Sequence, residues 1–237
     1  MSRPKTLIGA AVLAAAAMAI GLGPAAADPI GSNGQPVTPA AGDIVGVGSG
    51  VTQELFDQFA MDYNKTVKQS APHLYSWDAV NPRTGRFHDV ITAKAGCAPA
   101  PRPDNTNEGI GEAPNDPLGL TANTPTKTQA FCTDFARSAR GRQSNDPAAM
   151  PGGILFLSYG MDGVTWATNA KTNAPPNLSS AQLVAIYTCR ITNWGRVGGK
   201  NAPVDAQLPP ASSDTRARFL TALGAPRTCD RSGQVRG

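Results

Sequence analysis

The chain has 237 residues with 21 basic and 17 acidic side chains, which give a formal net charge of +4 at pH 7. A predicted 27-residue signal peptide holds two of the basic residues, so 19 basic and 17 acidic residues remain in the mature chain. This near-neutral balance argues against nucleic acid as a partner. Residues 28–237 are enough for two lobes of roughly 100 residues each or for one large α/β domain.

The first 27 residues have the three parts of a secretory signal peptide. Arg3 and Lys5 carry positive charge, an apolar run extends to Leu22, and small residues precede a predicted cut after Ala27. The run is short for a bilayer span, and no comparable run follows it. We therefore expect an exported, secreted protein with a flexible N-terminus over residues 28–42.

The four cysteines are expected to form disulfides, because export places them in an oxidising compartment and none has a C-x-x-C spacing. Three pairings are open. We favour Cys97 with Cys132 and Cys189 with Cys229, since each bridge then stays within one lobe of a two-lobed chain.

A predicted strand over residues 43–48 runs through a glycine and hydroxyl turn into a predicted helix over residues 53–64. Glycines allow close backbone approach, hydroxyls donate, and the first N–H groups of a helix are unpaired, so such a turn can hold an anion. The commoner role of these hydroxyls is to cap the helix. Residues 202–208 lead in the same way through residues 212–215 into a predicted helix over 216–223. Two such turns predict one ligand held between two lobes.

The other predicted elements alternate between strands and helices, which indicates an α/β fold with parallel sheets. We expect strands at residues 74–80, 131–135, 153–159 and 164–167, and a helix that opens at the capping box Ser179 to Gln182 and continues to Tyr187. Residues 81–128 are rich in proline, glycine and asparagine and are predicted to be loop, apart from a short strand at 89–93.

Charged residues near these elements carry less specific signals. Arg137 and Arg140 follow a predicted strand, which suits a carboxylate, phosphate or sulfate, although surface arginines are often only solvated. His73 and His88, the two histidines of the chain, have no acidic or cysteine partner at ligand spacing, so we predict no metal and no cofactor. The nucleophile spacing G-x-S-x-G is absent, which weakens the case for an enzyme.

Seven ordered segments resemble the phosphate-type solute-binding proteins of ABC importers, which have the two-lobed type II periplasmic-binding fold. The matching segments are residues 46–53, 76–79, 134–138, 159–166, 178–183, 191–194 and 212–216. The resemblance implies lobe 1 at residues 43–160, lobe 2 at residues 161–237, and a monomer that holds a small oxyanion between them. The residues that it points to are Ser49, Gly50, Thr52, Ser138, Ser213 and Thr215, with Arg137 as a candidate cation.

The chain departs from that family at the last turn. Asp214 stands where the family has a glycine, and Pro209 and Ala211 stand where phosphate binders have an arginine and an aspartate. A carboxylate in an anion site repels the ligand, which argues against tight phosphate binding. Relative to the family, we also expect the C-terminal return segment to be missing, so the chain would be a shortened relative.

The leading interpretation is an exported solute-binding protein that does no chemistry and presents its closed form to an ABC permease. One alternative is an exported interaction or adhesion protein that keeps the scaffold without a ligand. A less favoured alternative is a secreted phosphatase-like hydrolase.

Overall fold

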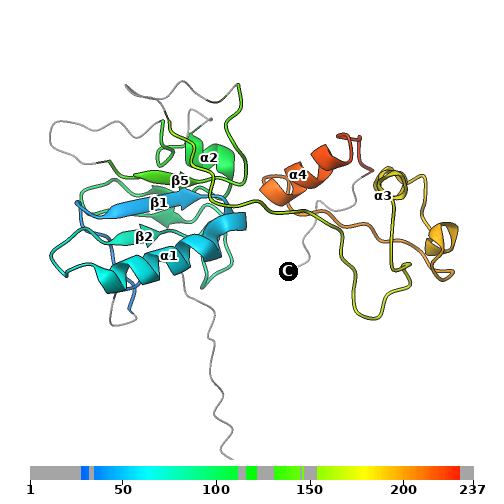
Figure 1. Cartoon of the computed structure of the whole chain (residues 1–237), viewed down its shortest axis with the longest axis horizontal. Coiled ribbons are helices and arrows are strands. Elements are labelled where there is room, and N and C mark those ends of the chain that lie inside the picture. The colour runs from blue at the N-terminus through cyan, green and yellow to red at the C-terminus, as the bar shows by residue number, and fades with distance from the viewer. Residues whose placement is uncertain are drawn as a thin grey trace, which may run out of the picture.

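The computed structural model describes residues 28–31, 35–111, 116–121, 131–144, 146 and 154–229. The predicted signal peptide lies outside these residues. The described chain forms two bodies joined by an extended segment (Figure 1). We refer to the described residues of 28–160 as lobe 1 and to those of 161–229 as lobe 2.

Lobe 1 is built on a three-stranded parallel sheet with the order β2-β1-β5. The central strand β1 (Ile44–Gly48) pairs with β2 (Leu74–Ser76) on one side and with β5 (Phe135–Arg137) on the other. Val45 and Val47 are fully buried, as expected for a strand covered on both faces. The α/β fold class and the strand at 43–48 are therefore confirmed.

Two predicted strands of lobe 1 differ from the observed ones. The strand expected at 131–135 lies further along the chain, because the side chain of Asp134 accepts a hydrogen bond from the Val45 N–H (2.7 Å) and the ladder begins at the next residue. The strand expected at 74–80 ends at Ser76. Beyond it the chain turns toward the next helix, where the Ala79 N–H donates to the Gln53 side chain (3.1 Å).

Helix α1 (Gln53–Thr66) follows β1 through the 3₁₀ turn η1 (Gly50–Thr52) and lies along β2 (Figure 1). The side chain of Asn64 joins the two elements. It accepts from the Leu74 N–H (2.7 Å) and donates to the Leu74 carbonyl (2.8 Å). The predicted helix is confirmed and ends two residues later than expected.

The region expected to be loop contains three short elements. Strands β3 (Val90–Ile91) and β4 (Ala100–Pro101) pair antiparallel, and helix α2 (Thr106–Ile110) packs at the end of β1. The short strand expected at 89–93 is confirmed in part, and the loop prediction is wrong for the other two elements. Buried side chains of this hairpin join the sheet in one apolar core: Val45, Val47, Ile91, Ala93, Ala100 and Leu118.

The contact of α2 with β1 depends on glycine. A Cβ atom at Gly109 would lie 2.8 Å from the Cα atom of Gly48. The disulfide Cys97–Cys132 ties the same hairpin to the chain that enters β5, with Cα atoms 5.9 Å apart. The close approach of Gly109 to Gly48 holds α2 at the carboxyl end of β1.

Lobe 2 is helical over its described residues. It contains α3 (Ser180–Tyr187), the 3₁₀ turn η2 (Trp194–Val197) and α4 (Asp214–Ala222). The capping box is confirmed, because the Ser179 hydroxyl accepts from the Gln182 N–H (3.2 Å) while the Gln182 side chain accepts from the Ser179 N–H (2.8 Å). Helix α4 begins two residues before the predicted start.

Three predicted strands are wrong where the structure describes them. Residues 154–159 and 164–167 are extended without a described ladder partner, and Leu155 and Leu157 are 79% and 75% exposed. Residues 202–208 form a single bridge, Asn193 with Pro203. An alternating apolar pattern needs a neighbouring strand, and the described chain supplies none here.

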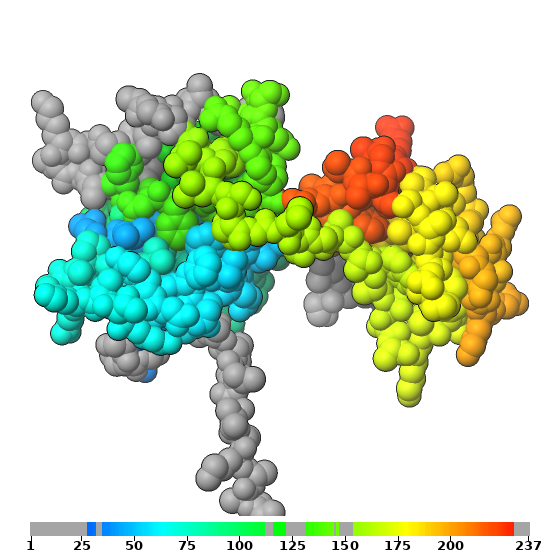
Figure 2. Space-filling model, viewed as in Figure 1, coloured from blue at the N-terminus to red at the C-terminus, as the bar shows by residue number. Residues whose placement is uncertain are grey.

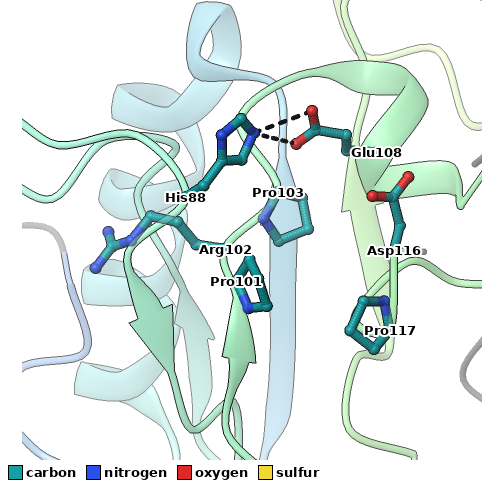
Figure 3. Close-up of a pocket in the computed structure, with 7 residues that line it drawn as sticks. All are labelled: His88, Pro101, Arg102, Pro103, Glu108, Asp116 and Pro117. Atoms are coloured by element: carbon teal, nitrogen blue, oxygen red, sulfur yellow. Dashed lines mark hydrogen bonds and ion pairs between the residues drawn. The ribbon is translucent and has the colours of Figure 1, made fainter.

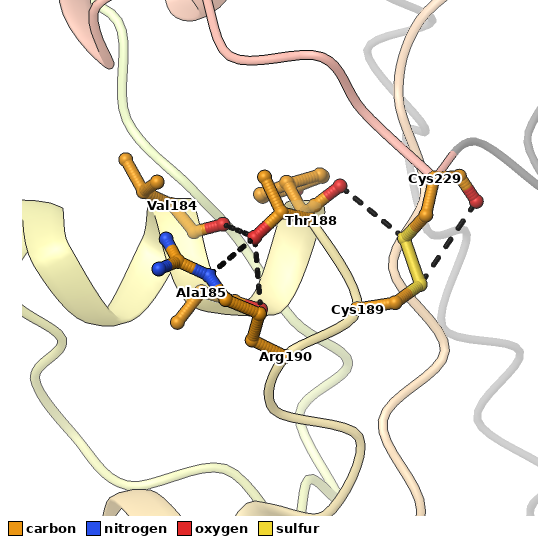
Figure 4. Close-up of a disulfide and its surroundings, with 7 residues drawn as sticks. Val184, Ala185, Thr188, Cys189, Arg190 and Cys229 are labelled. Atoms are coloured by element: carbon orange, nitrogen blue, oxygen red, sulfur yellow. Dashed lines mark hydrogen bonds between the residues drawn. A yellow bond between two sulfur atoms is a disulfide. The ribbon is translucent and has the colours of Figure 1, made fainter.

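The disulfide Cys189–Cys229 joins the end of α3 to the last described residue (Figure 4), with Cα atoms 5.9 Å apart. The rings of Tyr187 and Phe219 meet edge to face across α3 and α4, with centroids 5.1 Å apart. Figure 2 shows that the lobes meet over a narrow area, with α4 nearest to lobe 1. Of the described helices, none has the length and apolar character needed to cross a bilayer.

Candidate ligand site between the lobes

The first predicted turn lies at the carboxyl end of β1, where ligands of open parallel sheets commonly bind. Ser49 is buried, and its hydroxyl accepts from the Val51 N–H (3.3 Å), which is the capping role. Gly50 and Val51 are exposed. The Thr52 hydroxyl is buried and has no hydrogen-bond partner among the described residues. The turn therefore offers one unused hydroxyl beside an accessible backbone.

Arg137 lies behind this turn and not in a solvated loop. It is the last residue of β5, and its side chain is fully buried. Its guanidinium donates to the carbonyls of Ser49 (3.1 Å) and Gly48 (2.9 Å) and to the Ser76 hydroxyl (2.5 Å). Burial lowers the pKa of Arg137 to about 10. The guanidinium thus fixes the shape of the turn from the protein interior.

Two buried carboxylates lie near this guanidinium. Asp57 on α1 is 5% exposed and Asp78 after β2 is 3% exposed. Both oxygens of Asp57 and Oδ1 of Asp78 have no hydrogen-bond partner among the described residues. Burial, followed by the neighbouring negative charges, raises the pKa of each carboxyl to about 7. The sequence analysis did not identify Asp57. The available signal was a carboxylate among the apolar residues of an amphipathic helix.

The start of α2 forms hydrogen bonds between the lobes. The Thr106 N–H (3.0 Å) and the Thr106 hydroxyl (2.9 Å) both donate to Oδ2 of Asp214, the first residue of α4. The Thr106 hydroxyl also accepts from the Ala139 N–H (2.9 Å) after β5. The guanidinium of Arg218 on α4 donates to the Ala139 carbonyl. A carboxylate of lobe 2 is thus held by two donors of lobe 1.

Thr106 was absent from the predicted site. The available signal was the pattern Asn105 followed three residues later by Glu108, which is typical of a helix start. The Asn105 side chain does accept from the Glu108 N–H (3.1 Å). The signal was overlooked because the surrounding prolines and glycines indicated loop.

The other predicted residues lie around this contact. The Ser138 hydroxyl is engaged within its own loop, donating to the Arg140 carbonyl (2.6 Å). Arg140 pairs with Asp146 (2.6 Å). Ser213 caps α4, Thr215 follows in its first turn, and α4 approaches η1. The structure therefore brings the three turns to one region, centred on Thr106.

This region has the chemistry of an oxyanion site. A backbone N–H and a hydroxyl converge on one carboxylate oxygen, and the same donors can hold an oxygen of phosphate or sulfate. Two further hydroxyls belong to elements that contact each other across the lobes, Thr52 in η1 and Thr215 in the first turn of α4. Neither histidine forms a hydrogen bond with a serine or threonine hydroxyl in the part of the chain that the structure describes.

Comparison with known families gives one clear match. A model of the PBP superfamily domain matches residues 33–234, which include both lobes and all three turns. Searches of curated proteins and of solved structures give no significant match. Domains of this superfamily bind solutes. The match and the parallel sheet with its covering helices show that the chain belongs to the PBP superfamily, with a type II periplasmic-binding fold.

Proposed function

We propose that the protein is an exported solute-binding protein that holds a small oxyanion such as phosphate between its lobes and presents it to an ABC permease. The observation that carries this proposal is the pair of Thr106 donors on the Asp214 carboxylate. A carboxylate oxygen and a phosphate oxygen accept the same kind of hydrogen bond. The contact of Asp214 with Thr106 therefore supports an oxyanion site at the Thr106 donors.

Binding requires the ligand to replace Asp214. An incoming oxygen takes the Thr106 donors, and the Thr52 hydroxyl in lobe 1 and the Thr215 hydroxyl in lobe 2 supply further contacts. Contacts to both lobes favour the closed arrangement, which is how ligand binding is converted into a surface that a permease recognises.

Asp214 also sets the strength of binding. When it is ionised, a second negative charge at about 4 Å costs on the order of 1 to 4 kcal/mol. In addition, the carboxylate competes for the Thr106 donors. We expect the wild-type protein to bind phosphate weakly, and Asp214→Gly to bind it at least about tenfold more tightly, a difference of about 1.4 kcal/mol.

Isothermal titration with phosphate at one ionic strength tests the proposal. Asp205→Gly is the matched control, because it removes an exposed carboxylate elsewhere in lobe 2 and should leave affinity unchanged. Adding Thr106→Val to Asp214→Gly removes a donor and should reverse the gain. Equal phosphate affinity in the Asp214→Gly and Asp205→Gly variants would contradict the proposal.

The same contact favours a second candidate function. Because Asp214 already satisfies the Thr106 donors, the lobes can meet without a ligand, as an interaction or adhesion protein on this scaffold requires. In that case no oxyanion among phosphate, sulfate and carboxylates raises the melting temperature of the wild type or of Asp214→Gly. Saturable stabilisation by any of them excludes this alternative.

A further inference from the structure

One imidazole and two carboxylates meet beside the lobe contact. Nε2 of His88 lies 3.1 Å from both carboxylate oxygens of Glu108 and 3.6 Å from Oδ2 of Asp104. One possible ligand atom from each of the three residues lies within 4.8 Å of the others. Figure 3 shows the His88 ring and the Glu108 carboxylate turned toward each other, and both residues line a small cavity. Two separate segments of the chain thus direct nitrogen and oxygen atoms to one point.

Negative charge is in excess around this point. Two carboxyl groups, of Asp104 and Glu108, contact a single imidazole, and Asp116 adds a third carboxyl group to the lining of the adjoining cavity. The nearest guanidinium, on Arg102, is directed away from the cavity (Figure 3) and donates both Nη groups to Asp28 (2.8 and 3.0 Å). Even a protonated His88 leaves the group negative when the carboxyls are ionised. A bound cation would remove this imbalance.

Neighbouring donors orient the two carboxylates. Oδ1 of Asp104 accepts from the Asn105 side chain (2.6 Å), and Oδ2 accepts from the Ser212 hydroxyl of lobe 2 (3.2 Å). Oε2 of Glu108 accepts from the Asp104 N–H (2.9 Å). Outer contacts of this kind hold metal ligands in place before the ion binds. The side chain of Asp104 is 2% exposed, so its position is also fixed by packing.

The cavity provides room for the remaining ligands. Its volume of about 60 Å³ is bounded by Pro101, Pro103 and Pro117 in addition to the charged residues. A cavity of this volume has room for water beside His88 and Glu108, which line it. Three protein ligands with an open position for water is a common zinc arrangement.

We propose that His88, Asp104 and Glu108 bind a divalent transition-metal cation of the zinc class, with water from the cavity completing its coordination. An imidazole nitrogen with two carboxylates suits Zn²⁺, Co²⁺ or Mn²⁺, whereas Mg²⁺ and Ca²⁺ prefer oxygen ligands alone. This revises the expectation of no metal, which rested on ligand spacing along the chain. His88 and Glu108 are 20 residues apart, and the fold brings them together.

The cation site is separate from the oxyanion site but touches the same interface, because Ser212 of lobe 2 donates to Asp104. Its test does not depend on any solute. The disulfide-bonded mature chain is titrated with Zn²⁺ by calorimetry and with Co²⁺ by visible absorption. We expect one saturable site.

The two histidines supply a matched pair of variants. His88 has a left-handed backbone (φ 55°), which asparagine tolerates, so His88→Asn removes the imidazole with little strain. It should weaken Zn²⁺ binding by at least about tenfold, as losses at zinc sites commonly do. His73→Asn should leave affinity unchanged. Glu108→Gln should also weaken binding.

Nitrogen NMR of the wild-type imidazoles tests Zn²⁺ binding by His88 without any substitution. Zn²⁺ should shift Nε2 of His88 and leave His73 unaffected. The proposal is overturned if the wild type shows no stoichiometric Zn²⁺ or Co²⁺ binding, which would leave His88 and Glu108 as an ion pair only. It is also overturned if His73→Asn lowers affinity as much as His88→Asn does.

Discussion

Lobe 1 buries a continuous apolar cluster around a parallel sheet, whereas lobe 2 has four buried apolar side chains among its described residues, Leu183, Ile186, Val197 and Phe219. Each lobe carries one disulfide. Lobe 1 also buries Arg137, Asp57 and Asp78 near the turn that follows β1, and a small apolar core could not easily accommodate these charged groups. The comparison indicates that lobe 1 forms the rigid part of the site, while lobe 2 depends on its crosslink and its helix caps.

The variant with the largest expected effect on the free energy of unfolding tests the buried charges of lobe 1. Arg137→Met removes three hydrogen bonds and the positive charge near Asp57, and leaves Asp78 with Arg102 as its positive neighbour. Removing one partner from a buried ionic group costs about 3 to 5 kcal/mol. Urea unfolding should show this loss. Arg190→Met, at an exposed arginine of lobe 2, should change stability by less than about 0.5 kcal/mol.

A second prediction separates the two crosslinks. The bridges close loops of 35 and 40 residues, and the chain-entropy model gives each about 4 kcal/mol. Replacing Cys189 and Cys229 by serine should unfold lobe 2, because its few buried side chains cannot offset this loss. Replacing Cys97 and Cys132 should lower stability and leave the sheet of lobe 1 folded.

Hydrogen exchange followed by mass spectrometry tests whether each double variant unfolds its own lobe, because peptides from the two lobes can be compared in both variants. Retained protection of α3 and α4 after the loss of Cys189 and Cys229 would show that lobe 2 is held by contacts other than its crosslink.

The same contrast explains what could be predicted from the sequence. The elements that were found, β1, α1 and α3, have local signals: an apolar run, an amphipathic period and a capping box. The strands expected at 153–159 and 164–167 have a suitable pattern, but a strand is defined by its neighbour, and pairing is a property of the whole fold. For the same reason β5 begins where Phe135 meets Gly46 and not where the apolar run begins.

The site shows the same limit. The turn from Ser49 to Thr52 was predictable as a turn between a strand and a helix because the three elements are contiguous in the chain. The contacts of Thr106 and His88 were not predictable, because their partners Asp214 and Glu108 lie 108 and 20 residues away. Arg137 was recognised as a cation, yet its burial behind the turn depends on the register of β5 against β1.

A third prediction uses pH to read the buried carboxyls of lobe 1. The pKa values of Asp57 and Asp78 rise from 3.8 to about 7 on folding, so the folded state holds protons that the unfolded state releases between these values. This contribution is complete below about pH 4 and is lost as the pH rises through 7. Lobe 1 should therefore lose stability between pH 5 and 8, by about 2 kcal/mol per carboxyl, since one pKa unit corresponds to about 1.4 kcal/mol.

Asp57→Asn should flatten this pH dependence and stabilise the protein at pH 8. Asp62→Asn, on the exposed side of α1, is the control and should leave the slope between pH 5 and 8 unchanged. An equal slope in the Asp57→Asn variant and the wild type would mean that Asp57 is not the group that titrates.

The smallest effect concerns the helix cap of lobe 2. The Ser179 hydroxyl accepts from the Gln182 N–H, and the Gln182 side chain accepts from the Ser179 N–H, so two otherwise unpaired donors at the start of α3 are satisfied. Ser179→Ala removes one of these bonds and should cost about 1 kcal/mol. Ser180→Ala, one residue further into the helix, is also exposed but does not cap it. This control should be neutral or slightly stabilising because alanine favours helices.

Hydrogen exchange of the Ser179→Ala variant shows whether the lobes unfold separately. Because α3 carries two of the four buried apolar residues of lobe 2, the loss of stability should appear as faster exchange of α3 and α4 amides together, while the amides of β1 stay protected. Faster exchange in β1 as well would show that the two lobes unfold as one unit, and the contrast between a rigid lobe 1 and a crosslink-dependent lobe 2 would then be wrong.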